Sequence, residues 1–547
     1  MTNADIARVL TDTAQLMALA GENAFKARAY ETAADAIEAF AHPVQDLVNA
    51  GRALEIEGVG KSIAQSLREI LDTGTFAKRE ELLATVPRTV LELSRIKGLG
   101  PKKVQQLWQE LNIAAIADLE SALRSGQLDT VKGFGDKTKA ALLEAIAFYT
   151  AQRGRRRLPE ALKLTQALLP RLHAVPGIAQ AAPTGQLLRS LPVIEALEFV
   201  VAVAPGTLSP EGLLGHLSAT QATYLPHGAG YGTYTCTHAE GFTFRLIEVP
   251  EGTLEASVLA YAYPPDTPEA LQRQLSAYPP EAWDWLAGHP EALPTAPTHL
   301  VSEADIRGIL HAHSTWSDGQ HTLRAMAEAC LARGYGYLGI TDHSRTAAYA
   351  GGLSIERVAA QHAEIDALNA ELAPFRIFKG IESDILPDGS LDYPDAVLAS
   401  FDFVIGSIHS GFAMTEAQAT ERLVRAAQNP YCTLLGHPTG RLLLARPGYP
   451  VNLARVIDAC AEAGTAIELN SHPYRLDLDW EWQPYARERG VPTSLNPDAH
   501  STQGLADVQW GVRAARKGLV TPDGCLCCLD TQQLADYFTS RRARAKS

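Results

Sequence analysis

The stretch "ILHAHSTWSDGQ" (309–320) places three metal-binding side chains at the end of a short apolar run. His311, His313 and Asp318 fall within eight residues of sequence. Imidazole nitrogens and carboxylate oxygens suit zinc, manganese or iron better than magnesium or calcium. The stretch therefore predicts a strand that ends in a site for one of these metals.

The same pattern recurs along the rest of the chain, where apolar segments alternate with Ala-rich helical segments from Ile306 onward. Such alternation indicates a parallel sheet with crossover helices, and it repeats often enough for a barrel. The carboxyl ends of barrel strands build the active site, so ligands far apart in sequence are expected to meet at one mouth. The expected ligands are His311, His313, Asp318, His343, Glu382, His409, His437, Asp498 and His500.

The six histidines and three acids of this set exceed what one tetrahedral ion needs, so we expect two or three metal ions. Clustered ions activate water near neutral pH and hold the oxygens of a phosphate during in-line displacement. A lone histidine, in contrast, is usually a satisfied core or surface residue. That interpretation applies to His321, His362 and the seven histidines before residue 300.

The combined motifs resemble the PHP (polymerase and histidinol phosphatase) domain. In chain order they are "LHAHSTWSD", "ITDHS", "GIESDI", "SIHS", "GHPTGRLL" and "NPDAH". Their order and spacing match from residue 306 to about 540, and we place the domain at 303–540. The resemblance implies a distorted seven-stranded (β/α) barrel with a trinuclear metal site.

The resemblance also implies roles for single side chains. It assigns His311, His313 and Asp498 to one metal, His409 and His437 to a second that Glu382 bridges, and Asp318, His343 and His500 to the third. Arg441 and Arg475 would meet the substrate phosphate, with a structural ion pair as the alternative for each. Asp342 would orient His343 as an outer carboxylate, with a turn residue as the alternative.

Three similar turns, each followed by an amphipathic helix, are "IEGVGKSIAQSLREIL" (56–71), "IKGLGPKKVQQLWQEL" (96–111) and "VKGFGDKTKAALLEAI" (131–146). They resemble helix-hairpin-helix elements, where helix N-terminal amides receive a DNA phosphate without reading sequence. Helix packing is the alternative reason for the glycines. We expect helical domains at 1–78 and 79–157. The expected DNA-binding residues are Gly58, Gly60, Lys61, Gly98, Gly100, Lys102, Lys103, Gly133, Gly135 and Lys137, with Lys139 as a further cation.

Hairpins, a small α/β region and a PHP barrel together resemble the bacterial family X DNA polymerases over essentially the whole chain. The α/β region, at 158–295, corresponds to the polymerase palm. Gly185 of the family's Gly-Ser turn is present, but Gln186 replaces the serine. The three aspartate positions of the family fall on Ala196, Glu198 and Arg245. Two-metal nucleotidyl transfer needs carboxylates there, so we expect a degenerate palm that no longer polymerises.

The formal net charge of −14 gives no global attraction to nucleic acid, so DNA binding is expected from local cations and backbone amides. No secretory signal or membrane-spanning run is visible, and seven scattered cysteines suit a reducing compartment. The cluster "CLCC" (525–528) lacks a second ligand pair and is interpreted as inert thiols. The expected location is cytoplasmic.

We therefore expect a DNA-repair enzyme that hydrolyses terminal phosphodiesters as a 3′–5′ exonuclease, with abasic-site cleavage or removal of 3′ blocking groups as further activities. The expected cofactor is three Mn²⁺ ions, with Zn²⁺ or Fe²⁺ as alternatives. The expected partner is gapped, nicked or 3′-ended DNA, and the chain is expected to be monomeric. The alternatives are an active manganese-dependent polymerase with an exonuclease, a phosphatase for small phosphomonoesters, and a non-enzymatic DNA-binding scaffold.

Overall fold

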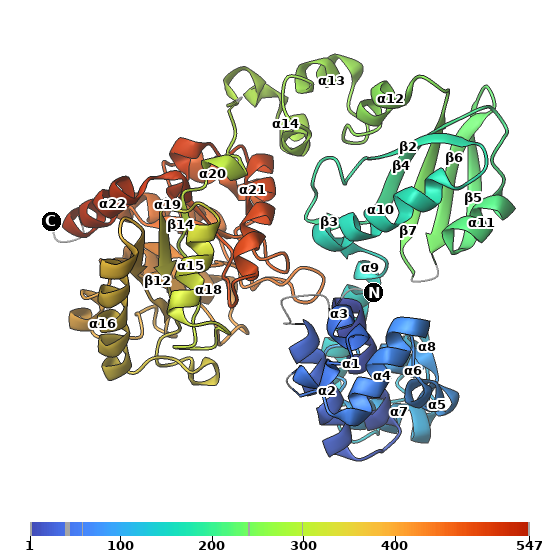
Figure 1. Cartoon of the computed structure of the whole chain (residues 1–547), viewed down its shortest axis with the longest axis horizontal. Helices are drawn as coiled ribbons and strands as arrows, with labels where there is room; N and C mark the ends of the chain where they lie inside the picture. The colour runs from blue at the N-terminus through green and yellow to red at the C-terminus, as the bar shows by residue number, and fades with distance from the viewer. Residues whose placement is uncertain (1–2, 39–43, 57, 239–240, 298, 545–547) are drawn as a thin grey trace. The chain divides into compact units, whose positions relative to one another are not determined.

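The computed structural model describes residues 3–38, 44–56, 58–238, 241–297 and 299–544 (Figure 1). It divides into two compact units, Met1–Arg153 and Gly154–Ser547. This division lies near the boundary expected at residue 157, while the boundaries expected at 78 and 295 fall inside the units and stay predictions. Within the described ranges, no helix is both long and apolar enough to cross a bilayer.

The first unit is built from helices, as the sequence predicts. Its α-helices are α1 (Asn3–Leu19), α2 (Ala24–Glu38), α3 (Val44–Asn49), α4 (Lys61–Thr73), α5 (Ala77–Thr85), α6 (Arg88–Leu93), α7 (Pro101–Leu111), α8 (Ile116–Ser125) and α9 (Asp136–Gln152). Helices α4, α7 and α9 are the three that follow the Gly-x-Gly turns. Their apolar faces, for example Leu67 and Leu107, are fully buried in one common core.

The glycines of the three turns have two different backbone roles. The first of each pair has a positive φ, which is +76° at Gly58, +94° at Gly98 and +94° at Gly133. Residues with a Cβ rarely adopt this conformation, so glycine is required there. The second glycine is the extended N-cap of the helix, and no side chain of the described residues caps any of the three. The first amides of these helices are therefore available to a ligand.

The second unit begins with a mixed five-stranded sheet in the order β2-β4-β7-β6-β5. Strands β4 and β7 are parallel, and the other neighbouring pairs are antiparallel. The strands are β2 (Ile178–Thr184), β4 (Ala196–Val203), β5 (Ala219–Gly228), β6 (Tyr231–His238) and β7 (Thr243–Val249). Helices α10 (Leu158–His173) and α11 (Pro210–Leu217) pack on the sheet through a core that includes Phe199 and Phe244.

A buried charge network joins three segments of the second unit. The Lys517 ammonium, which is fully buried, lies 2.6 Å from the Asp284 carboxylate of helix α14 (Trp283–Gly288). Asp284 also pairs with Arg189 at 2.9 Å, and Lys517 donates to the Arg189 carbonyl at 3.2 Å. Lys517 ends helix α21 (Val508–Lys517) of the C-terminal region. The network thus connects the five-stranded sheet region, the segment after it and the C-terminal domain.

Replacing Asp284 by alanine is expected to destabilise the second unit by roughly 3 kcal/mol, because two buried cations would lose their counter-charge. Lys517→Met should destabilise the second unit less than Asp284→Ala, since Asp284 keeps its ion pair with Arg189. Thermal unfolding of the full chain measures both. An unchanged midpoint for Asp284→Ala would show that the network contributes little.

The C-terminal domain is a ring of parallel strands in two sheets, ordered β10-β9-β8 and β11-β12-β13-β14-β15. Isolated parallel bridges, His343 to Glu382 and Ala312 to Ala499, link the two sheets on both sides. Strands β10 and β11 are separated by only two residues and form one pass of the chain, so the eight strands correspond to seven passes. The strands are β8 (Gly308–Ile309), β9 (Tyr337–Ile340), β10 (Arg376–Lys379), β11 (Glu382–Asp384), β12 (Ile405–Ser407), β13 (Leu434–Leu435), β14 (Ala466–Asn470) and β15 (Thr493–Asn496).

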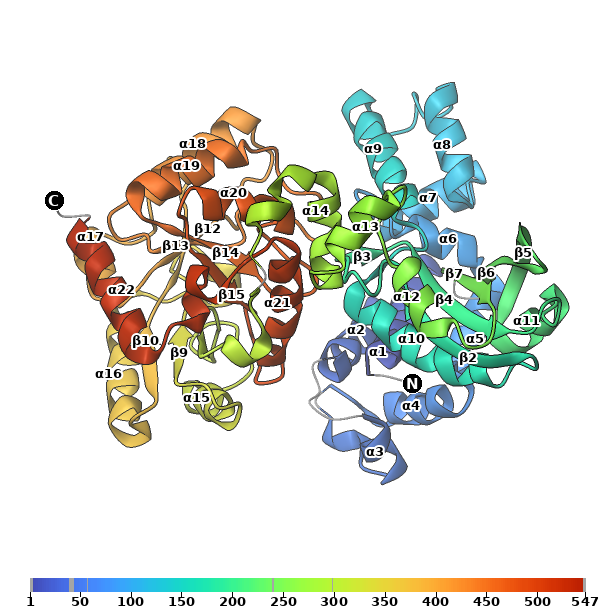
Figure 2. The ribbon, with the colours of Figure 1, turned by 90° about the horizontal axis from the view of Figure 1, so that it is seen from above.

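Helices surround this ring of strands, as Figure 2 shows. They include α15 (Leu323–Ala332), α16 (Ile355–Leu372), α18 (Glu416–Gln428), α19 (Leu453–Ala463) and α21. Strand residues such as Leu338, Ile377 and Leu495 are buried in the core between strands and helices. The predicted alternation of strands and helices is confirmed. The two bridged sheets form an interrupted ring, and its closure as a distorted seven-stranded barrel stays a prediction.

Candidate metal centre

The nine candidate ligands lie together at one end of the ring. His311 and His313 follow β8, His343 follows β9, and Glu382 lies beside His343 at the bridge between the two sheets. The other four strand-end ligands follow β12, β13 and β15, and they are His409, His437, Asp498 and His500. Asp318 comes from the loop after His313. Parallel strands bring their carboxyl ends to one mouth, which is why residues 189 positions apart in sequence can meet.

Glu382 is the hub of the cluster and is 1% exposed. Its two carboxylate oxygens face imidazole nitrogens from five histidines. The separations are 3.4 Å to His311 Nε2, 3.6 Å to His313 Nε2, 3.1 Å to His343 Nδ1, 3.1 Å to His409 Nε2 and 3.0 Å to His437 Nε2. A carboxylate with ligands on both oxygens has the geometry expected of a bridge between ions.

Two aspartates complete the cluster. Asp498 Oδ1 lies 3.1 Å from His313 Nε2 and 3.5 Å from His311 Nε2. Asp318 lies 3.4 Å from His500 Nε2 and 3.6 Å from His343 Nε2. The side chains of Asp318 and His500 are 34% and 36% exposed, whereas His409 is 10% exposed and the other candidate ligands are buried. The cluster therefore opens to solvent beside Asp318 and His500.

Three sets of potential ligand atoms lie within 4.8 Å of one another. The sets are His313, Asp318, His343 and His500; His311, His313 and Glu382; and His343, Glu382 and His409. The first contains the three ligands predicted for one metal, together with His313. The others divide the ligands differently from the predicted sets, because His313, His343 and Glu382 are each shared. The assignment of ligands to individual ions stays a prediction.

The ring nitrogens of the cluster need partners that the protein does not provide. His311 Nε2, His313 Nδ1, His343 Nδ1 and both nitrogens of His437 are buried with no hydrogen-bond partner among the described residues. Burying a polar atom without a partner is unfavourable. A bound cation would satisfy such nitrogens, so this donor set fits divalent metal ions.

Two carboxylates outside the predicted ligand set hold the histidine rings. Glu468 accepts from His311 Nδ1 at 2.7 Å and from the His437 amide at 2.8 Å. Asp384 lies 2.5 Å from His409 Nδ1. Such partners fix the tautomer and the direction of a ligating ring. Neither residue was predicted from the sequence. A usable signal was present, because each acid lies in a short buried strand, and Asp384 follows Glu382 by two residues and so lies on the same face.

The two arginines predicted to meet phosphate have different surroundings. Arg475 Nε lies 3.5 Å from Asp498 Oδ2, at the cluster itself. Arg441 forms an ion pair with Asp479 and donates to the Arg475 carbonyl at 3.0 Å. Both arginines thus make ion pairs, Arg475 at the cluster itself and Arg441 within the 475–479 loop, and the role of each stays a prediction.

Asp342 is fully buried, and its hydrogen bonds differ from those predicted. Its carboxylate accepts from the amide and hydroxyl of Ser314, at 2.8 and 2.7 Å, and from Ser317 and Gln361. No hydrogen bond between the Asp342 carboxylate and the adjacent His343 occurs among the described residues. Asp342 therefore positions the turn that follows His313, which corresponds to the turn-residue alternative.

Neighbouring charges separate the pKa values of the histidines. Burial lowers the pKa of His313 to about 3, with the charges of His500 and His343 adding to the effect. Burial also opposes protonation of His409 and His500, but adjacent carboxylates outweigh it. Glu382 and Asp384 raise the pKa of His409 to about 10, and Asp318 and Asp498 raise the pKa of His500 to about 9.

Metal binding is therefore expected to release at least two protons at pH 7.5, because His409 and His500 are protonated below their raised pKa values and must deprotonate to bind a cation. Burial opposes protonation of His311 too, but the carboxylates of Glu468, Asp498 and Glu382 raise its pKa well above the ordinary value, which adds to the release. Metal affinity should consequently rise with pH up to about 9 to 10. Calorimetric titration with Mn²⁺ in buffers of different ionisation enthalpy counts the protons. His500→Ala should lower the count by about one, and His362→Ala should leave it unchanged. A count of zero would contradict the prediction.

The residues predicted to occupy the palm site lie on two neighbouring strands and the turn before them, and their correspondence to the palm stays a prediction. Glu198 of β4 pairs with Arg245 of β7 in the strand register, and their side chains form an ion pair at 3.0 Å. Ala196 begins β4. A Cβ at Gly185 would lie 1.8 Å from the Glu198 carboxylate, so this turn packs directly on Glu198. The other acid of these two strands, Glu248, is buried and accepts from Tyr224 and the Gly232 amide.

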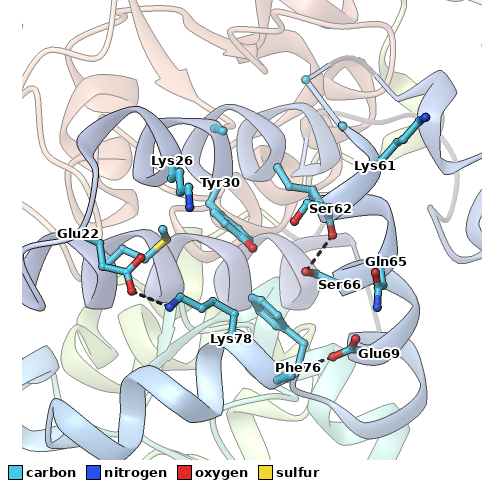
Figure 3. Close-up of a pocket in the computed structure, with 16 residues that line it drawn as sticks. Glu22, Lys26, Tyr30, Lys61, Ser62, Gln65, Ser66, Glu69, Phe76 and Lys78 are labelled. Atoms are coloured by element: carbon cyan, nitrogen blue, oxygen red, sulfur yellow. Dashed lines mark hydrogen bonds and ion pairs between the residues drawn. The ribbon is translucent and has the colours of Figure 1, made fainter.

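A cavity of about 680 Å³ adjoins the first Gly-x-Gly turn of the helical unit. Lys26 and Tyr30 of α2 point into it, and Lys78 of α5 lies across from them, paired with Glu22 at 2.6 Å (Figure 3). Lys61 also lines it. Sequence reading singled out only the lysines directly after the glycine turns and therefore missed Lys26 and Lys78.

The predicted DNA-binding lysines fall into two groups. Lys61, Lys102 and Lys137 are exposed beside their turns. Lys103 donates to the Gly98 carbonyl at 3.3 Å, and Lys139 pairs with Asp129 and Asp136. The second group thus already has partners within the unit, so the exposed group is the better source of charge for a phosphate.

Three family models match the chain over four segments, and each segment lies within one of the two compact units. Residues 1–76 match a helix-hairpin-helix domain, and residues 50–112 and 90–147 match a SAM-like helix-hairpin-helix tandem. Residues 310–472 match the PHP domain. The fold and the site thus define a helix-hairpin-helix protein with a metal-dependent PHP domain.

Curated relatives fall into two groups. The chain is 33% identical over 551 residues to the DNA polymerase/3′-5′ exonuclease PolX of Bacillus subtilis (strain 168), covering 95% of this chain and 96% of that protein. This relative shows that the chain belongs to the PolX family of bacterial family X DNA polymerases. A probable phosphatase of Thermoanaerobacter sp. (strain X514) is 25% identical over 236 residues, 39% of this chain and 93% of that protein. A probable phosphatase of Acetivibrio thermocellus is 29% identical over 199 residues, which cover 35% of this chain and 78% of that protein.

Proposed function

We propose that this protein is a metal-dependent phosphodiesterase that removes nucleotides from DNA 3′ ends. The observation that carries the proposal is the gathering of five imidazoles around Glu382, with buried ring nitrogens that make no hydrogen bond among the described residues. The PolX relative, whose name includes a 3′–5′ exonuclease, supports the choice of DNA as substrate.

Each part of the cluster has a proposed role. The nine predicted ligands would hold the ions, for which we propose Mn²⁺, with Zn²⁺ or Fe²⁺ as alternatives. Divalent ions bound there would activate a water molecule and neutralise the charge of the phosphodiester. Glu468 and Asp384 keep His311 and His409 in one orientation. Arg475, beside Asp498, would hold a phosphate oxygen.

The helical unit would supply affinity for DNA. Uncapped helix amides after Gly60, Gly100 and Gly135 provide phosphate-binding groups, and exposed lysines such as Lys61 add charge. Contacts of this kind are made to the phosphate backbone and do not depend on sequence. They also account for DNA binding by a chain whose net charge is −14.

We further propose that the palm has lost nucleotidyl transfer and serves as a scaffold. The Glu198–Arg245 ion pair places a cation among the positions that need carboxylates for magnesium. The activity would then belong to DNA repair, at gaps, nicks, abasic sites or blocked 3′ ends. A cytoplasmic location would suit both this substrate and the seven free thiols.

Phosphatase activity on small phosphomonoesters is the second candidate, favoured by the similarity of the C-terminal domain to probable phosphatases. A single experiment separates the two. End-labelled gapped, nicked and abasic duplexes are incubated with Mn²⁺, and phosphate release from histidinol phosphate is measured in parallel. Shortening from the 3′ end supports the exonuclease, whereas phosphate release without DNA cleavage would favour the phosphatase.

A further inference from the structure

A strongly exposed aromatic side chain stands beside the metal-ligand cluster. Tyr349 is 74% exposed, and its ring centroid lies 6.5 Å from that of His343. His343 in turn lies 3.6 Å from Asp318 and has its ring centroid 6.2 Å from that of His500, the two solvent-facing ligands. The ring of Tyr349 therefore lies beside His343, which in turn neighbours the two solvent-facing candidate ligands.

The loop that carries Tyr349 is held in place on both sides. Ser344 and Leu353 form a parallel bridge, and the Leu353 amide donates to the His343 carbonyl at 2.9 Å. Ala347 and Ala350, which flank Tyr349, are buried at 0% and 3% exposure. A side chain on such a fixed loop can bind a ligand with little loss of backbone entropy.

The beginning of the same loop is fixed by a buried acid. Asp392, 2% exposed, accepts from the Thr346 amide at 2.7 Å and from Arg345 Nε at 3.1 Å. The loop thus resists displacement while it presents an exposed ring. Stabilisation of the fold does not explain that ring, because a side chain that is 74% exposed buries little apolar surface.

The other exposed tyrosine near the cluster is already engaged. Tyr474 precedes Arg475, and the guanidinium of Arg157 stacks on its ring at 3.6 Å. No cation stacks on Tyr349 among the described residues, and its one close ring neighbour is the ligand His343. Tyr349 is therefore the ring at this mouth whose face a planar ligand can use.

We propose that Tyr349 is a stacking platform for an unpaired nucleobase at the 3′ end of DNA. One deoxyribose separates a base from its phosphate, so a nucleotide with its phosphodiester at the cluster can place its base on this ring. Stacking accepts every base, because each has a π face, but it requires that the base has left its duplex partner. The platform would favour single-stranded or frayed ends over paired ones. This inference rests on the proposed exonuclease function.

A substrate series tests the platform. Two single-stranded oligonucleotides are compared, one with an ordinary 3′-terminal nucleotide and one whose terminal residue is a base-free tetrahydrofuran, with Mn²⁺ and subsaturating DNA. The wild type should remove the base-bearing residue roughly five- to a hundredfold faster. Tyr349→Ala should bring the two rates together, while Tyr349→Phe, which keeps the ring, should preserve the difference.

The control is Tyr261→Ala, which removes a tyrosine of 42% exposure outside the barrel and should leave the rate ratio unchanged. A Tyr349→Ala protein that keeps the wild-type ratio, or that loses both rates equally, would overturn the proposal. Equal loss would indicate that the residue supports the loop instead of the base.

Photocrosslinking tests whether the terminal base contacts Tyr349, independently of cleavage. An oligonucleotide with 5-iodouracil on a phosphorothioate-linked 3′-terminal residue is irradiated with the full chain in Ca²⁺, and the attachment site is mapped by mass spectrometry. Attachment at residue 349 in the wild type and in Tyr349→Phe supports the platform. Absence of that attachment refutes it. If the wild type cuts no 3′ end, the proposed function fails, and the crosslink alone decides the role of Tyr349.

Discussion

His313→Ala is expected to lower nuclease activity by more than about a hundredfold while DNA affinity stays at the wild-type value. His313 belongs to two of the three sets of potential ligands and lies 3.1 Å from Asp498 and 3.6 Å from Glu382. Loss of an outer partner of a ligand typically costs 10- to 100-fold, so loss of a shared ligand should cost more. Release of label from a 3′-tagged gapped duplex with Mn²⁺ measures the activity.

The DNA affinity should not change, because the hairpin turns lie in the separate unit Met1–Arg153. A gel shift on the same duplex in Ca²⁺ measures it. His362→Ala is the matched control, since His362 lies on helix α16 and belongs to none of the three ligand sets. Cleavage of DNA by His313→Ala at the wild-type rate would show that the barrel is not the nuclease active site.

Primer extension is expected to be undetectable with either Mg²⁺ or Mn²⁺. The three predicted carboxylate positions hold Ala196, Glu198 and Arg245, and the only acid among them, Glu198, is engaged by Arg245 at 3.0 Å. Loss of such a set of catalytic groups typically lowers a rate by on the order of 10⁴-fold or more. The assay should use the His313→Ala variant, because an active nuclease would degrade the extended product and hide a polymerase.

Two controls make this test decisive. Binding of the gapped duplex by His313→Ala is verified in the same buffer, so that absence of extension cannot be caused by loss of DNA binding. Arg245→Ala is added to remove the cation; extension should still be absent, because the carboxylates are not restored. A deoxynucleotide-dependent ladder in either protein would instead support the active-polymerase alternative.

The ligand residues of the barrel could be predicted because each is encoded locally. A short apolar strand followed at once by His311, His343 or His409 is a pattern confined to a few residues, and it repeats with the strands. The glycine turns are equally local, since a positive φ at Gly58 or Gly98 is a property of a single residue. The predicted loss of the palm acids likewise depends on single residues, and it stays a prediction.

The partners of these residues could not be predicted, because they come from other strands. Glu468 could be recognised as the residue that holds His311 only when β14 and β8 are placed in one ring. The same holds for Lys26 and Lys78, which meet across a cavity from two helices. Arg441 and Arg475 looked equivalent in sequence, and only their contacts with Asp479 and Asp498 distinguish them.

The sequence by itself thus determined the chain's helical hairpins and its alternating strands and helices, and it predicted the metal-binding side chains and the loss of the palm acids. Each of these depends on the order of neighbouring residues. Only the tertiary structure decided that Glu382 is shared by five histidines, that Asp342 supports a turn, and that the ring of Tyr349 lies beside His343. The reason is that distances between side chains on different strands are set when the ring of strands forms and not by any one segment.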